Sequence, residues 1–493
     1  MSKLIDNLSN LTRTQNGAVA FASTGSKVLD YWTLACSFTV AGNEFQDNRL
    51  RQSFADAMAE DPDLAIRAML NAYDVRKGAG RRDAFRLSFL AALQRGALTV
   101  QQLVQLVDAV PFFGRFDMLV KLLAEAGLRL DAAIRRELVH ACLSRIQRAL
   151  ADPEEAALCA KWLPRKGTEA NRVRGFLGLK PADYRHLLAQ YATVETVISA
   201  NRWADVVYEH VPSKAGLKYR AAFHRHDGPR YQSYLDGVAA GTESMHQSVS
   251  YPYEIVSMAS DGCDYYSAVG AAAAVPFWKA LLANADYDRS AGVLPIVDVS
   301  GSMFCPLAGG RARLIDAAIG LGLYLAHTNQ GLFANEVVTF SHHPEFLKLT
   351  GEFDKDLLKV ANADWGRNTN LDAVFDTMLS RAVAAGIAPE EMPRVVLVLS
   401  DMEFDPAKQR FTGYEMIRAR YDASGYPMPL VVFWKLASSS PYPSVASQPG
   451  VVMVSGFSPN MIKPILECDF EAASPLRLMR DVLMDPRYDV VKW

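Results

Sequence analysis

The sequence predicts two units of different fold class, a helical array followed by a doubly wound α/β domain. In the first 285 residues, apolar side chains recur at helical spacing between proline and glycine breaks. From about residue 290, dense apolar runs rich in Val, Ile and Leu alternate with helical segments. Such runs are typical of a mostly parallel sheet that is covered on both faces. We therefore expect a helical-repeat domain over residues 1–285 and an α/β domain over residues 286–493.

The helical elements are expected wherever apolar residues return every three or four positions. They recur in three early segments: Leu64, Met69, Leu70 and Tyr73; Leu87, Phe89, Leu90 and Leu93; and Leu103, Leu106, Val107 and Val110. Helices of about 10–18 residues joined by short turns predict stacked helical hairpins, as in HEAT-like arrays. No clean fixed-period repeat accompanies them, so this prediction concerns architecture.

The strands of the second unit are expected where apolar runs end in turn residues. They cover residues 293–300, 336–340, 345–349, 394–401, 430–434 and 451–457, with helices at 314–326, 370–384 and 476–484. The turn SHHP separates the second and third of these runs, which predicts a hairpin.

Composition excludes several classes of protein. The chain has 493 residues, of which 50% are hydrophobic and 22% are charged, so it has enough apolar material for large cores. Its six cysteines are scattered and form no CxxC pair, which argues against a disulfide scaffold. No apolar run reaches the ~18 residues that span a bilayer, and the segment MSKLIDNLSN lacks the apolar core of a signal peptide. We expect a soluble, cytoplasmic, monomeric protein without membrane contact.

The net charge of −2 conceals an uneven distribution along the chain. Residues 161–230 contain 13 Lys and Arg against 6 Asp and Glu, a net of +7. Residues 76–95 contain six Lys and Arg against one Asp, a net of +5. Residues 290–405 contain 8 Lys and Arg against 15 Asp and Glu, a net of −7. The helical half is thus basic in two tracts, whereas the α/β half is acidic.

A D-x-S-x-S turn follows the first strand of the α/β domain. It contains Asp298, Ser300 and Ser302, and the carboxyl ends of strands are where open α/β sheets bind ligands. One carboxylate and two hydroxyls form a hard oxygen set suited to Mg²⁺ or Mn²⁺. The alternative is a turn in which these side chains cap backbone amides.

Two later residues complete a recognisable pattern. Thr369 precedes a predicted helix, and Asp401 ends a second buried strand. With Asp298, Ser300 and Ser302, they resemble the metal-ion-dependent adhesion site of von Willebrand factor A domains, which have a Rossmann-like fold. That resemblance covers about residues 290–493 and implies a magnesium site that a partner's carboxylate completes. Arg367 and Asn368 stand where the family usually has a glycine-rich turn.

The two basic tracts predict anion binding. Cations neutralise phosphates, and interleaved aromatic rings such as Tyr219, Phe223 and Tyr231 offer stacking faces for unpaired bases. The alternative is a set of solvated helix faces with the aromatic rings in the core. The candidate RNA-binding residues are Arg76, Lys77, Arg81, Arg82, Lys161, Arg165, Lys166, Arg172, Arg174, Lys214, Lys218 and Arg220.

The order of the units resembles the Ro autoantigen family, in which a TROVE helical-repeat ring precedes a von Willebrand factor A domain. The phrases VRKGAGRRDAFR, VPFFGRFDMLVKLL and KWLPRKG look like a divergent branch, found in bacteria and their phages and described as a domain of unknown function. Ro proteins bind single-stranded ends of misfolded RNA and small structured RNAs. The resemblance implies the same ligands for the basic tracts of this chain, in a ribonucleoprotein.

The sequence is compatible with two functions and disfavours a third. The first is non-enzymatic RNA binding through the helical half. The second is a protein-interaction module whose metal is completed by a partner's carboxylate, without RNA. The third, a metal-dependent hydrolase, is disfavoured because nothing in the sequence nominates a second metal or a general base. A phosphotransferase is disfavoured because neither GxxxxGK[ST] nor GxGxxG occurs and no base adjoins Ser302.

Overall fold

The described part of the first 285 residues is built almost entirely from successive helices. The structure, a computed structural model, describes residues 11–13, 19–37, 43–191, 194–246, 251–260, 266–307, 312–339, 344–363, 371–402, 414–437, 442–443, 450–468 and 473–491. The α-helices of this half are α2 (Lys27–Cys36), α3 (Glu44–Glu60), α4 (Pro62–Tyr73), α5 (Arg82–Gln94), α6 (Val100–Phe113), α7 (Asp117–Arg129), α8 (Ala132–Ala151), α9 (Ala156–Trp162), α10 (Thr168–Phe176), α11 (Pro181–Ala189), α12 (Val194–Ser199), α13 (Ser213–Ala240), α14 (Pro252–Val256) and α15 (Ala268–Leu282). Within these ranges no helix is long and apolar enough to cross a membrane.

Side-chain caps fix where several of these helices begin. Thr99 and Gln102 form a capping box at the start of α6, in which each side chain accepts the other residue's backbone N–H. The Asp131 carboxylate accepts the N–H groups of Ala133 and Ile134 at the start of α8. These caps satisfy backbone donors that the first turn of a helix leaves without partners.

The second half contains the mixed six-stranded sheet. Its strands are β3 (Val293–Val297), β4 (Glu336–Thr339), β5 (Phe346–Lys348), β6 (Val395–Ser400), β7 (Leu430–Lys435) and β9 (Val451–Ser455), in the order β5-β4-β3-β6-β7-β9. β4 and β5 form the predicted antiparallel hairpin, and the other neighbouring pairs are parallel. Chain order reverses beside β3, so loops from β3 and β6 meet at the same edge.

Helices cover both faces of this sheet, which confirms the doubly wound α/β prediction. They are α16 (Leu314–Thr328), α17 (Phe353–Ala361), α18 (Leu371–Ala385), α19 (Tyr414–Ala423), α20 (Ile462–Glu467) and α21 (Pro475–Leu483). Val374 and Ile417, from α18 and α19, pack with Val396 and Val398 on one face of the sheet. The opposite face, with Leu397 and Leu399, joins a core that includes α16 and the helical half.

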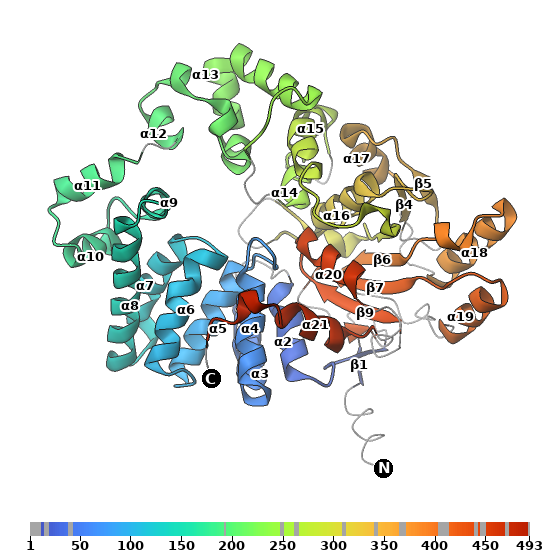
Figure 1. Cartoon of the computed structure of the whole chain (residues 1–493), viewed down its shortest axis with the longest axis horizontal. Helices are drawn as coiled ribbons and strands as arrows, with labels where there is room; N and C mark the ends of the chain where they lie inside the picture. Colours follow the sequence, from blue (N-terminus) through green and yellow to red (C-terminus); the bar gives the residue numbers. More distant parts are fainter. Residues whose placement is uncertain are drawn as a thin grey trace.

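The helical half follows an arc whose two ends both meet the α/β half (Figure 1). At one end α2 contacts β9 and α21, and α4 also contacts α21. At the other end α14 packs on α16, and α15 packs on α17. The α/β half therefore closes the arc.

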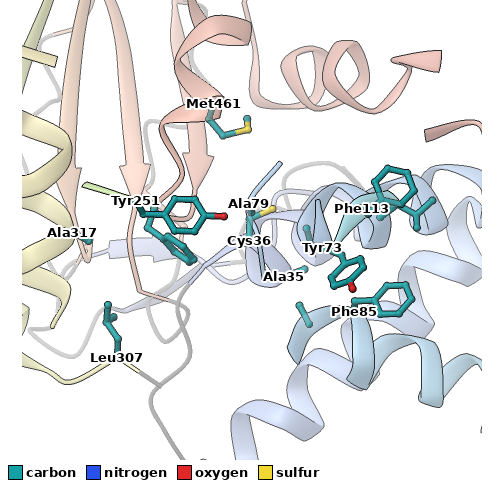
Figure 2. Close-up of a cluster of buried hydrophobic side chains, with 14 of the residues drawn as sticks. Ala35, Cys36, Tyr73, Ala79, Phe85, Phe113, Tyr251, Leu307, Ala317 and Met461 are labelled. Carbon is teal, nitrogen blue, oxygen red and sulfur yellow. The ribbon is translucent and has the colours of Figure 1, made fainter. Parts of the chain in front are cut away.

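One hydrophobic core runs across this junction (Figure 2). Cys36, Ala79 and Tyr251 from the helical half belong to the same buried cluster as Met461 from the α/β half. Gly456, just after β9, has a φ of 108°, and a Cβ there would lie 2.8 Å from the Cys36 carbonyl oxygen. Glycine at this position therefore permits the close approach of α2.

A small second sheet joins a segment near the N-terminus to a segment of the α/β half. It consists of β1 (Leu11–Arg13), β2 (Val19–Phe21) and β8 (Tyr442–Pro443) in antiparallel order. The sequence did not indicate it, because strands of two or three residues are too short to show an alternating pattern.

Candidate metal centre and nucleic-acid interface

The adjoining ends of β3 and β6 bring Asp298 and Ser400 together. The two strands pair in register, with Val297 opposite Leu399, so the next residues leave the sheet side by side. The Ser400 hydroxyl donates to Asp298 Oδ2 at 2.6 Å. The Ser300 backbone N–H donates to Asp298 Oδ1 at 2.8 Å. Both carboxylate oxygens of Asp298 are thus held in fixed directions.

The turn after β3 also positions the two predicted serine hydroxyls. Residues Gly301–Phe304 form a short 3-10 helix, and Ser300 Oγ lies 3.2 Å from Ser302 Oγ. Asp298 is only 2% exposed, whereas Ser302 is exposed. The cluster is therefore buried at its carboxylate and reaches solvent at its hydroxyls.

A second buried carboxylate gives this cluster an excess of negative charge. Asp401, 4% exposed, follows β6. Burial and the negative charge of Asp401 raise the pKa of Asp298 to about 6. A divalent cation would favour the ionised form of Asp298, so the donor set fits the hard metal ion that the sequence predicts.

The backbone after Asp401 has an uncommon conformation. Met402 has a φ of 67°, in the left-handed region that non-glycine residues rarely adopt. Its N–H donates to Ser400 Oγ at 3.0 Å, so the hydroxyl that binds Asp298 also holds this turn. Ser400 therefore couples the ends of the two strands.

The structure accordingly brings together Asp298, Ser300 and Ser302 and places Asp401 near Asp298. Thr369 lies outside the described residues. Across the described ranges, no three or more His, Cys, Asp or Glu side chains gather as a metal-binding group. The predicted set contains only two such side chains and relies on hydroxyls for its remaining ligands.

Sequence reasoning missed two polar residues at this edge. Ser400 was overlooked although it directly precedes the predicted ligand Asp401. Lys435, at the end of β7, pairs in register with Ser400 and is 1% exposed. The sequence signal for Lys435 was its position directly after the apolar run LVVFW. A lysine that is fully buried almost always has a partner, so this position indicates a polar group at the end of the strand.

The first basic tract divides between exposed and structural cations. Arg76 and Lys77 are exposed and border a cavity of about 770 Å³ between the two halves. Arg76 also donates to the Phe112 carbonyl oxygen. Arg81 is buried, which lowers its pKa, and Arg82 lies 3.6 Å from an Asp117 carboxylate oxygen.

The second tract begins around the turn between α9 and α10. Arg165 and Lys166 are exposed there, and no carboxylate of the described chain pairs with either. Lys161 is half-buried, with its ammonium 5.9 Å from the centre of the Trp162 ring. The Arg115 guanidinium lies 3.9 Å from the same ring centre, so a cation already covers one face of Trp162.

Two further cations of this tract have structural partners. Arg172 donates to the Leu123 carbonyl oxygen at 2.7 Å and to Glu169 at 2.9 Å. Arg174 donates to the Leu179 carbonyl oxygen at 3.0 Å. Both side chains are half-buried, so they brace neighbouring helices.

The last predicted cations lie on α13. Lys214, Lys218 and Arg220 are all exposed, although Lys214 pairs with Glu254 at 2.8 Å. The expected stacking role of Phe223 and Tyr231 is wrong, because both rings are buried against Tyr208. Apolar spacing along a helix directs such rings into the core.

The fold and the site define a helical array joined to an α/β domain that carries an oxygen-rich cluster at its sheet edge. Residues 293–481 match a domain of unknown function (DUF7788), and residues 144–286 match another (DUF2828). The chain is 25% identical to the uncharacterized protein L728 of Acanthamoeba polyphaga mimivirus, over 97% of this chain and 88% of that protein. The crystal structure of the Ro (RSR) protein of Deinococcus radiodurans is similar with a TM-score of 0.49 at 15% identity, covering 94% of this chain and 99% of that one.

Proposed function

We propose that this protein binds single-stranded or small structured RNA through exposed cations of its helical half. The observation that carries this proposal is the separation of charge, with +7 over residues 161–230 against −7 over residues 290–405. Arg165 and Lys166 are solvent-exposed in a turn and have no carboxylate partner in the described chain. When such cations neutralise RNA phosphates, the counterions condensed on the RNA are released. This release drives binding without base specificity.

The test is the salt dependence of RNA affinity. Fluorescence anisotropy with an oligoribonucleotide of about 12 nucleotides is measured between about 50 and 200 mM salt. Arg165→Ala combined with Lys166→Ala should weaken binding and lower the slope of log affinity against log salt by about 1.4. The matched control removes two exposed arginines from the other half, Arg418→Ala with Arg480→Ala, and should leave the slope unchanged. Absence of wild-type binding at about 50 mM salt contradicts the proposal.

We propose further that the α/β half holds Mg²⁺ or Mn²⁺ at Asp298, Ser300, Ser302, Thr369 and Asp401. Two nearby buried carboxylates and an adjacent pair of hydroxyls support this assignment. The metal would supply a positive centre to which a protein partner contributes a carboxylate. Ser302 Oγ lies 3.2 Å from Ser300 Oγ, so both hydroxyls are available to one metal ion.

Metal binding is tested by thermal unfolding with and without Mg²⁺. Mg²⁺ should raise the melting temperature of the wild type, because a ligand that binds only the folded state stabilises it. Asp298→Asn should abolish the shift, whereas Asp422→Asn, which changes an exposed aspartate on α19, should retain it. An equal shift in Asp298→Asn contradicts the metal assignment. Affinity capture with and without EDTA then identifies partners that depend on the metal.

A further inference from the structure

Helix α8 carries two kinds of arginine. Arg145 forms two hydrogen bonds with the Glu155 carboxylate, at 2.7 and 2.6 Å, and Arg148 pairs with Asp108. Arg135 and Arg136, near the start of the helix, are exposed, and no carboxylate of the described chain pairs with them. Within the described residues, the arginines at the end of α8 are thus held in ion pairs, whereas Arg135 and Arg136 at its start are not.

Arg135 and Arg136 border a groove of about 390 Å³ between α8 and α10. Arg135, Arg136 and His140 line it from α8, and Arg172 and Phe176 line it from α10. Arg172 is held in place by the Leu123 carbonyl oxygen and by Glu169. Among the described residues no acidic side chain lines the groove, so it favours an anionic ligand.

An aromatic surface accompanies these cations. The rings of His140 and Phe176 lie 6.0 Å apart between centroids at an interplanar angle of 70°. Phe176 is 36% exposed, and the other residues of α10 are largely polar. An exposed ring beside unpaired arginines can contact a planar group while the arginines bind a neighbouring phosphate.

We propose that this groove binds a nucleotide of a single-stranded RNA, with its phosphate on Arg135 and Arg136 and its base against Phe176 and His140. The inference rests on the proposed RNA-binding function and assigns it a site formed by α8 together with Arg172 and Phe176 of the second basic tract. The combination of cations and an exposed ring favours a nucleic acid over an acidic protein segment, because a carboxylate chain offers no base to stack.

The test compares two groove variants in the RNA assay described above. Arg135→Ala with Arg136→Ala should weaken binding and lower the salt slope by about 1.4. Phe176→Ala should weaken binding about tenfold and leave the salt slope unchanged, because no phosphate contact is lost. Arg418→Ala with Arg480→Ala is again the control for loss of two positive charges. Thermal unfolding of each variant establishes that it is folded.

A second measurement uses the unaltered protein. RNA containing 4-thiouridine is crosslinked by light, and the modified peptides are identified by mass spectrometry. Crosslinks on α8 and α10 near His140 and Phe176 support the groove. If the wild type binds RNA but crosslinks elsewhere, or if the groove variants bind as tightly as the wild type, the groove assignment is overturned and RNA binding stands. If the wild type binds no RNA, the proposed function fails and the groove assignment fails with it.

Discussion

His327 links the two halves of the molecule through buried hydrogen bonds to Trp278 and Asp356. The Trp278 indole N–H, on α15, donates to His327 Nδ1 at 3.0 Å, and His327 Nε2 lies 3.0 Å from Asp356 Oδ2 on α17. Because an indole only donates, the proton of His327 lies on Nε2 and is donated to Asp356. Asp356 also accepts from the N–H and hydroxyl of Thr350 and from the N–H of Gly351.

We predict a pH-dependent contribution of Asp356 to stability. Burial would raise the pKa of Asp356, but hydrogen bonds from His327 and Thr350 outweigh burial and lower the pKa below its ordinary value. The stabilisation is therefore present above the unfolded pKa of about 3.9 and is lost as pH falls through the lower folded value. Asp356→Asn should cost about 1–3 kcal/mol at neutral pH, and its difference from the wild type should shrink below about pH 4. Urea unfolding across pH, with Asp422→Asn as control, checks this; a difference independent of pH contradicts it.

At the scale of single elements, α16 shows how small residues bring a helix close to the sheet. Its residues are buried on almost every side, between β3 and α14. A Cβ on Gly322 would lie 2.4 Å from Val297 Cγ2 on β3. Glycine at this position therefore sets the distance between α16 and the end of β3, the strand that leads into the loop with Ser300 and Ser302.

Gly322→Ala should accordingly destabilise the protein by about 1–3 kcal/mol, because the added methyl group overpacks a core that cannot shift freely. Gly175→Ala on α10 is the matched control, since nothing lies within 4 Å of its added Cβ. The control should be neutral or slightly stabilising, as alanine is the better helix former. Denaturant midpoints of the two variants measure the contrast; equal midpoints would show that α16 has room to move.

At the scale of the whole molecule, the C-terminal segment anchors the α/β half to the helical half. Arg487 Nε donates to Asp74 Oδ2 at 2.5 Å, and Asp74 is fully buried. Tyr488 accepts from Asn71 Nδ2 at 3.0 Å and donates to Asp74 at 3.3 Å. These bonds lie in the junction across which the shared hydrophobic core runs.

Arg487→Met should therefore destabilise the whole chain by about 3–5 kcal/mol, because it leaves a buried carboxylate without its cation. Arg480→Met removes an exposed arginine of α21 and should change stability by less than about 0.5 kcal/mol.

Calorimetry and circular dichroism should show the two halves unfolding in a single transition for the wild type. Two well-separated transitions would mean that the shared core does not couple them.

Much of this architecture is encoded in short stretches of sequence. Apolar periodicity located the helices around Leu70, Leu90 and Leu106 and the buried strands of the sheet. The D-x-S-x-S turn identified Asp298 and its serines, because the turn and its hydroxyls are adjacent in the chain. These features depend on residues a few positions apart, and local patterns therefore suffice to predict them.

Contacts between distant segments could not be inferred in the same way. The register of β3 and β6 places Ser400 on Asp298, and the packing of the helices brings Arg136 of α8 and Phe176 of α10 to one groove. The packing of helices, rather than residue type, separates Arg81, which is buried, from Arg165, which is exposed. The local sequence thus specifies which elements form and what charges they carry. Which side chains meet depends on long-range packing, because partners far apart in the chain are selected only when the complete core is assembled.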